Sequence, residues 1–224
     1  MIRSKNILLA LTLIFSLVVS QNSFAFLKNF RSSSQSQSIL DQNLALNPKV
    51  LDLAVKAYKN AEKKGEVKKP FLTIIDYSLP STEKRLWLVD LRNKKVLLHT
   101  WVAHGSGSGL THAERFSNIH GSHQTSLGVF VTGGTYQGRH GTSLRLHGLE
   151  EGINHRAESR GIVIHGAPYV SERYLKNAGR LGRSWGCPAI SFDVSKRLIE
   201  TIKNGSVVFS YYPQKSWLKT SKYL

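Results

Sequence analysis

The sequence predicts a mainly β domain, a β-sandwich or barrel with a few short helices and an N-terminal helix. Short apolar segments of strand length recur from residue 71 onward, and Gly-rich or polar segments separate them. The chain has 224 residues, which is enough for one domain with a hydrophobic core.

The first 25 residues have the pattern of a secretory signal peptide. Arg3 and Lys5 form a basic start, Ile7–Val19 is apolar, and a small-x-small cleavage signal ends at Ala25. The apolar run is about 13 residues long, whereas a membrane-spanning helix needs about 20. We therefore expect removal of residues 1–25, no transmembrane span afterwards, and export to the periplasm or cell wall.

The chain is strongly basic, with 31 Lys and Arg against 14 Asp and Glu and a net charge of +17. Such a surface attracts polyanions. Because an exported protein does not meet chromosomal DNA, we expect no nucleic-acid partner, and the charge points to anionic envelope polymers.

Four regions follow the signal peptide. Residues 26–46 are rich in Ser, Gln and Asn and are expected to be a flexible spacer. Residues 47–66 form a packing helix, because Asn47 is a good N-cap and Pro48 suits the first helical position. Residues 67–213 are expected to form the main domain, and residues 214–224 a basic tail.

Within residues 67–213 the apolar segments predict seven strands, at Phe71–Leu79, Arg85–Leu91, Lys95–Ala103, Leu127–Thr132, Ser143–Leu149, Gly161–His165 and Ser206–Tyr212. Two short helices are expected at Ser171–Ala178 and Asp193–Lys203, closed by Gly179 and Gly205.

The single cysteine, Cys187, lies in the polar turn Gly182–Pro188 and not in an apolar segment. His165 ends an apolar strand, a place where a rigid scaffold presents a side chain. An imidazole beside a thiol accepts its proton and activates it as a nucleophile. We therefore predict Cys187 as the nucleophile and His165 as its base.

The neighbours of this pair suit acyl transfer. Gly186 leaves backbone N–H groups around Cys187 free to converge on one point, where they would stabilise an oxyanion. The carbonyl of Gly166 is placed to hold the second imidazole nitrogen and fix the tautomer. Arg183 adds positive charge that favours the thiolate.

These residues resemble the catalytic motif of the L,D-transpeptidases, which ends in Ser/Thr-x-Gly-Cys. His165-Gly166 is followed by 17 residues and then by Ser184-Trp185-Gly186-Cys187. The murein L,D-transpeptidase catalytic domain subgroup is the closer match, through the segments Tyr136–Gly148, Ile162–Ala167 and Arg180–Ala189. The resemblance runs from about Phe71 to Tyr212, and Trp185 stands where many family members have His.

The resemblance implies an L,D-transpeptidase-like β-sandwich and a defined reaction on peptidoglycan stem peptides. The thiolate attacks the carbonyl of the third residue of a stem tetrapeptide, releases the terminal D-Ala and passes the acyl group to an amine, giving a 3→3 cross-link. By position, Gly166 supplies the orienting carbonyl and Ser184–Cys187 form the oxyanion turn. Arg183 is placed to bind a donor carboxylate. The further candidate substrate contacts are Tyr136, His140, Arg145 and His147.

Two of the candidate residues also fit a purely structural role. Arg145 alternates with leucines and fits a solvated strand position, and Trp185 fits loop packing as well as a substrate pocket. The short signal and the subgroup favour a Gram-negative periplasm.

Two other functions are compatible with the same sequence. An L,D-carboxypeptidase or a hydrolase of lipoprotein–wall bonds would use the same Cys187 and His165, with water as the acceptor. A non-catalytic wall-binding module would need neither residue. We expect no metal and no cofactor, because the chain has no His-Glu-x-x-His motif and no Cys pair.

Overall fold

The computed structural model describes residues 34–42 and 45–224. The predicted signal peptide, residues 1–25, and part of the predicted spacer lie outside the described residues. None of the described helices is long and apolar enough to cross a membrane.

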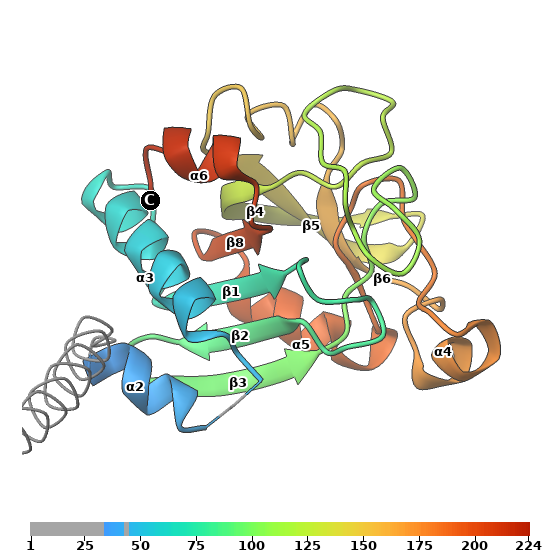
Figure 1. The fold of residues 1–224 in the computed structure, drawn as a ribbon, viewed down its shortest axis with the longest axis horizontal. Helices are drawn as coiled ribbons and strands as arrows, with labels where there is room; N and C mark the ends of the chain where they lie inside the picture. Colours follow the sequence, from blue (N-terminus) through green and yellow to red (C-terminus); the bar gives the residue numbers. More distant parts are fainter. Residues whose placement is uncertain (1–33, 43–44) are drawn as a thin grey trace, which may run out of the picture. The chain divides into compact units, whose positions relative to one another are not determined.

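One eight-stranded sheet forms the centre of the described region, and the mainly β class is confirmed (Figure 1). The strands lie in the order β3-β2-β1-β8-β4-β5-β6-β7. Along the chain they are β1 Phe71–Asp76, β2 Leu86–Asp90, β3 Lys95–Thr100, β4 Gly128–Gly138, β5 Gly141–Gly148, β6 Val163–Gly166, β7 Ala189–Ile190 and β8 Val207–Tyr211.

The sheet is mixed, because two of its neighbouring pairs are parallel: β1 with β8, and β6 with β7. Strand β8, the last in the chain, lies between β1 and β4 and joins the early and late parts of the sheet. Parallel neighbours need a crossover and cannot be joined by a tight hairpin. The crossover between β6 and β7 contains the turn that carries the thiol.

Five helices are described: α2 Ser34–Leu40, α3 Pro48–Lys63, α4 Glu172–Ala178, α5 Phe192–Ile202 and α6 Lys215–Thr220. Helix α3 lies within the predicted range, and the side chain of Asn47 caps it by accepting the N–H of Lys49 at 2.9 Å. Its apolar face is buried, and the helix packs against β1 and β8.

The predicted flexible spacer differs from the structure in its described part. Residues 34–40 are helical, and Ile39, Leu40 and Leu46 are buried in the main core. The side chain of Gln42 also donates to the carbonyl of Lys94 at 2.6 Å, beside the edge strand β3. The prediction of a spacer was based on the abundance of Ser and Gln, and it gave too little weight to the few apolar side chains that attach this segment to the domain.

The predicted basic tail, residues 214–224, is likewise packed against the domain. Trp217 on α6 is fully buried, and its ring N–H lies 3.2 Å from both carboxylate oxygens of the buried Glu150. The ammonium group of Lys64 lies 3.6 Å from the centre of the Tyr223 ring. The tail is therefore part of the fold, although its lysines keep it basic.

A small second core supports the crossover between β6 and β7. Its buried members are Ala103, Ala167, Val170, Leu181 and Ala189. They come from both ends of the crossover and from the segment after β3, so packing fixes the turn that holds Cys187.

Candidate active site

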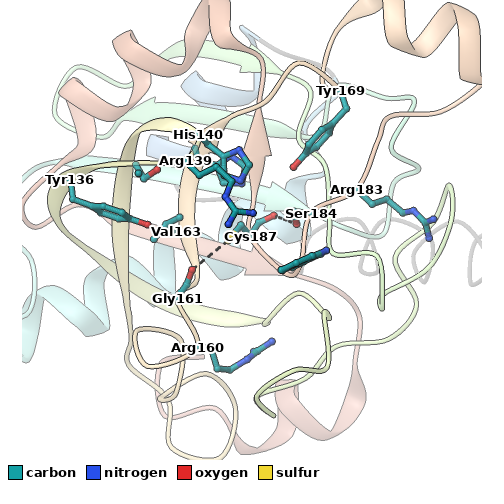
Figure 2. Close-up of a pocket in the computed structure, with 14 residues that line it drawn as sticks. Tyr136, Arg139, His140, Arg160, Gly161, Val163, Tyr169, Arg183, Ser184 and Cys187 are labelled. Atoms are coloured by element: carbon teal, nitrogen blue, oxygen red, sulfur yellow. Dashed lines mark hydrogen bonds between the residues drawn. The ribbon is translucent and has the colours of Figure 1, made fainter.

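Cys187 and His165 line one pocket of about 430 Å³ (Figure 2). His165 lies on β6, where its register partner is Ala189 of β7, two residues beyond Cys187. The parallel pairing of β6 with β7 therefore brings together two residues that the sequence separates by a 21-residue crossover. Of the other predicted site residues, Arg183, Ser184, Trp185 and Tyr136 also line this pocket.

The thiol of Cys187 is partly buried and contacts a carbonyl. Its Sγ donates to the carbonyl oxygen of Gly161 at 3.5 Å. Burial raises the pKa of Cys187, while a backbone N–H bond from Val163 and the charge of Arg160 oppose that rise. The resting sulfur is therefore a neutral thiol at neutral pH, and it needs a base to become a nucleophile.

His165 has the tautomer that such a base requires. Its Nδ1 lies 2.8 Å from the carbonyl oxygen of Gly166. Because a carbonyl only accepts, Nδ1 carries the hydrogen and Nε2 keeps a free lone pair. The side chain is 2% exposed, and burial lowers the pKa of His165, as does the nearby His140. At neutral pH the imidazole is therefore uncharged and able to accept a proton.

The Ser184–Cys187 turn is held at several points. The N–H of Ser184 donates to the carbonyl of His104 at 3.0 Å, and the carbonyl of Ser184 accepts the N–H of Ser106 at 2.7 Å. Its hydroxyl donates to the carbonyl of Cys187 at 2.6 Å and accepts the N–H of Gly186 at 3.1 Å. The turn is therefore fixed before any substrate binds.

These bonds change which N–H groups are free for an oxyanion. The N–H of Gly186 is already used by the Ser184 hydroxyl. Within residues 34–42 and 45–224, the N–H groups of Trp185 and Cys187 donate to no other residue. They are the donors that the turn leaves free for a developing negative charge.

Gly186 has a backbone that other residues rarely adopt. Its φ is +121°, and a Cβ there would lie 2.8 Å from the carbonyl oxygen of Gln124. The turn thus packs closely against the 119–125 loop. Trp185, which is 72% exposed, stacks on His123 of that loop with ring centres 4.9 Å apart.

Three arginines line the pocket, Arg139, Arg160 and Arg183, and no Asp or Glu lines it. The three guanidinium groups differ in how many of their N–H donors already bind protein oxygens. Arg160 donates four bonds to protein oxygens, and Arg183 donates from one nitrogen to the carbonyls of Ser106 and Gly109. In the part of the chain that the structure describes, the guanidinium of Arg139 has no protein acceptor. It points into the pocket (Figure 2).

Two of the predicted substrate contacts lie elsewhere. Arg145 is exposed, and its guanidinium lies 4.7 Å from the centre of the Tyr136 ring, outside the pocket lining. His147 lies 2.9 Å from a carboxylate oxygen of Glu158 and does not line the pocket either. Both share a face of β5 with Ser143, which lines the pocket, but they lie two and four residues further along the strand, beyond the pocket.

Sequence reasoning missed Arg139, Arg160 and Tyr169. Arg139 and His140 form the two-residue turn between β4 and β5, where His140 stacks on His165 with ring centres 4.3 Å apart. Tyr169 follows β6, and burial and the nearby Cys187 raise its pKa to about 12. Arg139 lies inside the segment Tyr136–Gly148 of the family resemblance, and Arg160 and Tyr169 lie two residues outside the segment Ile162–Ala167. This closeness to the segments is the one signal that the sequence offers for these residues.

Among the described residues, no group of three or more His, Cys, Asp or Glu side chains lies close enough together to hold a metal ion.

A sequence model of the L,D-transpeptidase catalytic domain matches residues 42–211. Among curated proteins, no sequence is significantly similar to the chain. The match covers most of the described domain and begins upstream of β1, so it includes helix α3.

Several solved structures are similar to this one. The L,D-transpeptidase from Mycobacterium smegmatis has 14% identity and a TM-score of 0.39, with 64% of this chain and 59% of that chain covered. An L,D-transpeptidase from Stackebrandtia nassauensis has 19% identity and a TM-score of 0.38, with 72% and 65% covered. One from Xylanimonas cellulosilytica has 15% identity and a TM-score of 0.38, with 79% and 90% covered. The chain thus spans less than two thirds of the first two proteins.

Proposed function

Because the chain belongs to the family of L,D-transpeptidase catalytic domains, we propose that it is an exported peptidoglycan L,D-transpeptidase that forms 3→3 cross-links. The observation that carries this proposal is the pairing of Cys187 with His165 in one pocket, with Nδ1 of the imidazole held by Gly166. The thiol is the nucleophile, and Nε2 of His165 is the base.

In the first half-reaction Nε2 takes the proton of the thiol. The thiolate attacks the carbonyl carbon of the third residue of a donor stem tetrapeptide, and the oxygen of the tetrahedral adduct becomes negative. The free N–H groups of Trp185 and Cys187 stabilise it. As the adduct collapses to a thioester, His165 returns the proton to the leaving nitrogen and D-Ala departs.

In the second half-reaction the side-chain amine of another stem peptide attacks the thioester. His165 takes a proton from the amine and returns it to the sulfur as the new amide forms. If water replaces the amine, the product is a trimmed tripeptide and the activity is that of a carboxypeptidase.

The charge of the pocket supports an acidic substrate. Stem peptides carry carboxylates, and an arginine fork is well matched to a carboxylate. Among the described residues, Arg139 is the pocket arginine whose donors meet no protein acceptor, so it is the first candidate to bind a donor carboxylate. Within the same residues, Arg183 donates from one guanidinium nitrogen and keeps the other two for the same task.

Export is the remaining part of the proposal. It is supported by the basic start, apolar run and small-x-small signal of residues 1–25. The net charge of +17 suits a location among anionic envelope polymers.

The test is mass spectrometry of the products formed from a disaccharide-tetrapeptide by the chain without residues 1–25, with Cys187→Ala beside it. A joined dimer that has lost one D-Ala, absent in the variant, is expected. Tripeptide alone would replace the transpeptidase with a carboxypeptidase. Absence of both product and thiol adduct with a carbapenem would favour a wall-binding module.

A second experiment tests the role of His165 as the base. We expect His165→Gln to lower the rate of D-Ala release about 10²–10⁴-fold, the usual contribution of a general base. His120→Gln changes an exposed histidine that does not line the pocket and is the matched control. A His165→Gln rate within a few-fold of wild type would remove this residue from its role.

A further inference from the structure

Arg160 is a pocket cation with neutral partners only. Its Nη1 donates to the carbonyl of Ser117 and the hydroxyl of Ser126, both at 2.5 Å. Its Nη2 donates to the hydroxyl of Ser122 at 3.2 Å and the carbonyl of Gln124 at 2.7 Å. Among the described residues, no carboxylate forms an ion pair with it. The guanidinium is therefore held rigidly while its charge stays uncompensated.

The donor count separates Arg160 from a substrate-binding arginine. A guanidinium has five N–H donors, and four of those on Arg160 are already used by protein oxygens. The remaining Nε–H cannot form the two parallel bonds by which arginine grips a carboxylate. The residue is thus built to supply charge at a fixed point.

That fixed point lies in the pocket that holds the thiol. Gly161, the next residue in the chain, provides the carbonyl that accepts the Cys187 S–H at 3.5 Å. Arg160 lines the same pocket, and Figure 2 shows its side chain beyond Gly161, on the far side of this carbonyl from the thiol. The S–H···O bond stabilises the neutral thiol and opposes the thiolate, since a carbonyl repels a negative sulfur. An uncompensated cation at this position offsets that repulsion.

Several other titratable or charged groups surround Cys187: Arg139, Arg183, His140, His165, Tyr77, Tyr136 and Tyr169. Burial raises the pKa of Tyr77 and of Tyr169, so both are neutral at pH 7, and His165 is neutral until it accepts the thiol proton. Arg183 is bound to loop carbonyls, and its side chain points away from the thiol in Figure 2. Arg139 is exposed and carried on a hairpin turn, where solvent screens its charge. Arg160 is left as the cation of this pocket that the protein holds in a fixed place.

We propose that Arg160 is a positioning residue whose half-buried, fixed charge stabilises the thiolate of Cys187 during formation of the thioester. The proposal rests on the proposed role of Cys187 as the nucleophile. The electrostatics of the site agree with this proposal, because the charge of Arg160 lowers the pKa of Cys187.

Arg160 also has a structural task, which the experiment has to separate from its charge. Its four bonds fasten the loop of residues 117–126, and the Gln124 carbonyl of this loop packs against Gly186. Arg160→Lys keeps the charge and loses most of these bonds. Arg160→Gln and Arg160→Met lose the charge as well, and Gln retains a polar group for the loop.

The measurement is the pH dependence of alkylation of the single cysteine by iodoacetamide, which reacts with the thiolate only. It reads the thiol directly and needs no turnover, so failure of the proposed transpeptidase would not affect it. The same profiles are recorded with His165→Gln in the background, because a thiol and the base that takes its proton titrate as a pair.

Arg160→Met and Arg160→Gln are expected to raise the pKa of the thiol by about one unit, which slows alkylation at pH 7 about tenfold. Arg160→Lys is expected to stay within about threefold of wild type. Arg156→Met, four residues away on the same turn segment and outside the pocket, removes an equal charge and is expected to leave the profile unchanged.

An unshifted profile in a folded Arg160→Gln variant would overturn the proposal. So would an equal shift in Arg160→Lys and Arg160→Gln, since the loop bonds would then be the cause and not the charge. Thermal unfolding of each variant shows which of them are folded, and if Met does not fold, the pair of Lys and Gln decides.

Discussion

Gly186→Ala tests whether the fixed shape of the Ser184–Cys187 turn matters for the chemistry. At φ +121° the backbone of Gly186 lies where L-residues are strained, at a cost of about 1–3 kcal/mol. The added Cβ would also lie 2.8 Å from the carbonyl oxygen of Gln124 and 3.0 Å from Cδ1 of Ile162, and overpacking of this kind costs about 1–3 kcal/mol.

The chain is expected to relieve part of this cost by moving the turn. A movement of about 1 Å carries Cys187 and its N–H away from the reacting carbonyl, and a displacement of that size costs about 100-fold in rate. We therefore expect the rate of acylation by a carbapenem to fall at least about 100-fold. The free energy of unfolding should fall by only about 1–3 kcal/mol, and the protein should remain folded.

Gly65→Ala is the matched control. Gly65 also has a positive φ, +76°, but no atom lies within 4 Å of a Cβ there, and it lies at the end of helix α3. It should lose about 1 kcal/mol from strain alone and keep its acylation rate. The reasoning is refuted if folded Gly186→Ala is acylated within about threefold of wild type, because the turn geometry would then be dispensable.

Two further predictions concern stability. Burial first, and then the charge of Arg85, lower the pKa of the fully buried His104 to about 3 from its ordinary 6.5. The unfolded chain therefore binds more protons between pH 6.5 and 3, so stability falls as pH falls, by at most about 1.4 kcal/mol per unit. Urea unfolding at several pH values should show that the free energy of unfolding depends less steeply on pH in His104→Asn than in wild type. An equal pH dependence in both proteins would contradict the assignment of this effect to His104. Ile39→Ala on α2 should lower the free energy of unfolding by about 2–4 kcal/mol, while the exposed Gln37→Ala should change it little, as measured by urea unfolding. Equal, small losses in both variants would mean that α2 is not part of the cooperative fold.

Local features of the sequence predicted much of the fold. Helix α3 begins at Pro48, because Asn47 and Pro48 are a cap and a first-turn residue in any context. Seven predicted strands have counterparts in the structure, with differences at their ends. Strand β4 continues past Thr132 to Gly138 through an irregularity at Gly133 and Gly134, where the glycines had indicated a turn. The two-residue strand β7 has too short an apolar segment to be predicted.

Some residues of the candidate site could likewise be predicted from local sequence, and others could not. The sequence predicts Cys187 because its polar turn is unusual for a buried cysteine, and His165 because it ends an apolar strand. Their spacing also resembles that of a family motif. Arg160 has no such signal: its side chain is defined by four oxygens from the loop of residues 117–126. Arg145 had a local signal, but it lies two residues beyond the pocket residue Ser143 along β5 and does not line the pocket.

The sequence by itself determined the mainly β class, the capped helix, the export pattern and the Cys–His pair, because each depends on residues close together in the chain. The tertiary structure alone decided that β8 lies between β1 and β4, that α2 and the C-terminal tail pack on the domain, and which arginines face the thiol. These depend on strand register and on packing between distant segments, where small differences in burial and hydrogen bonding select one arrangement among many with the same local pattern.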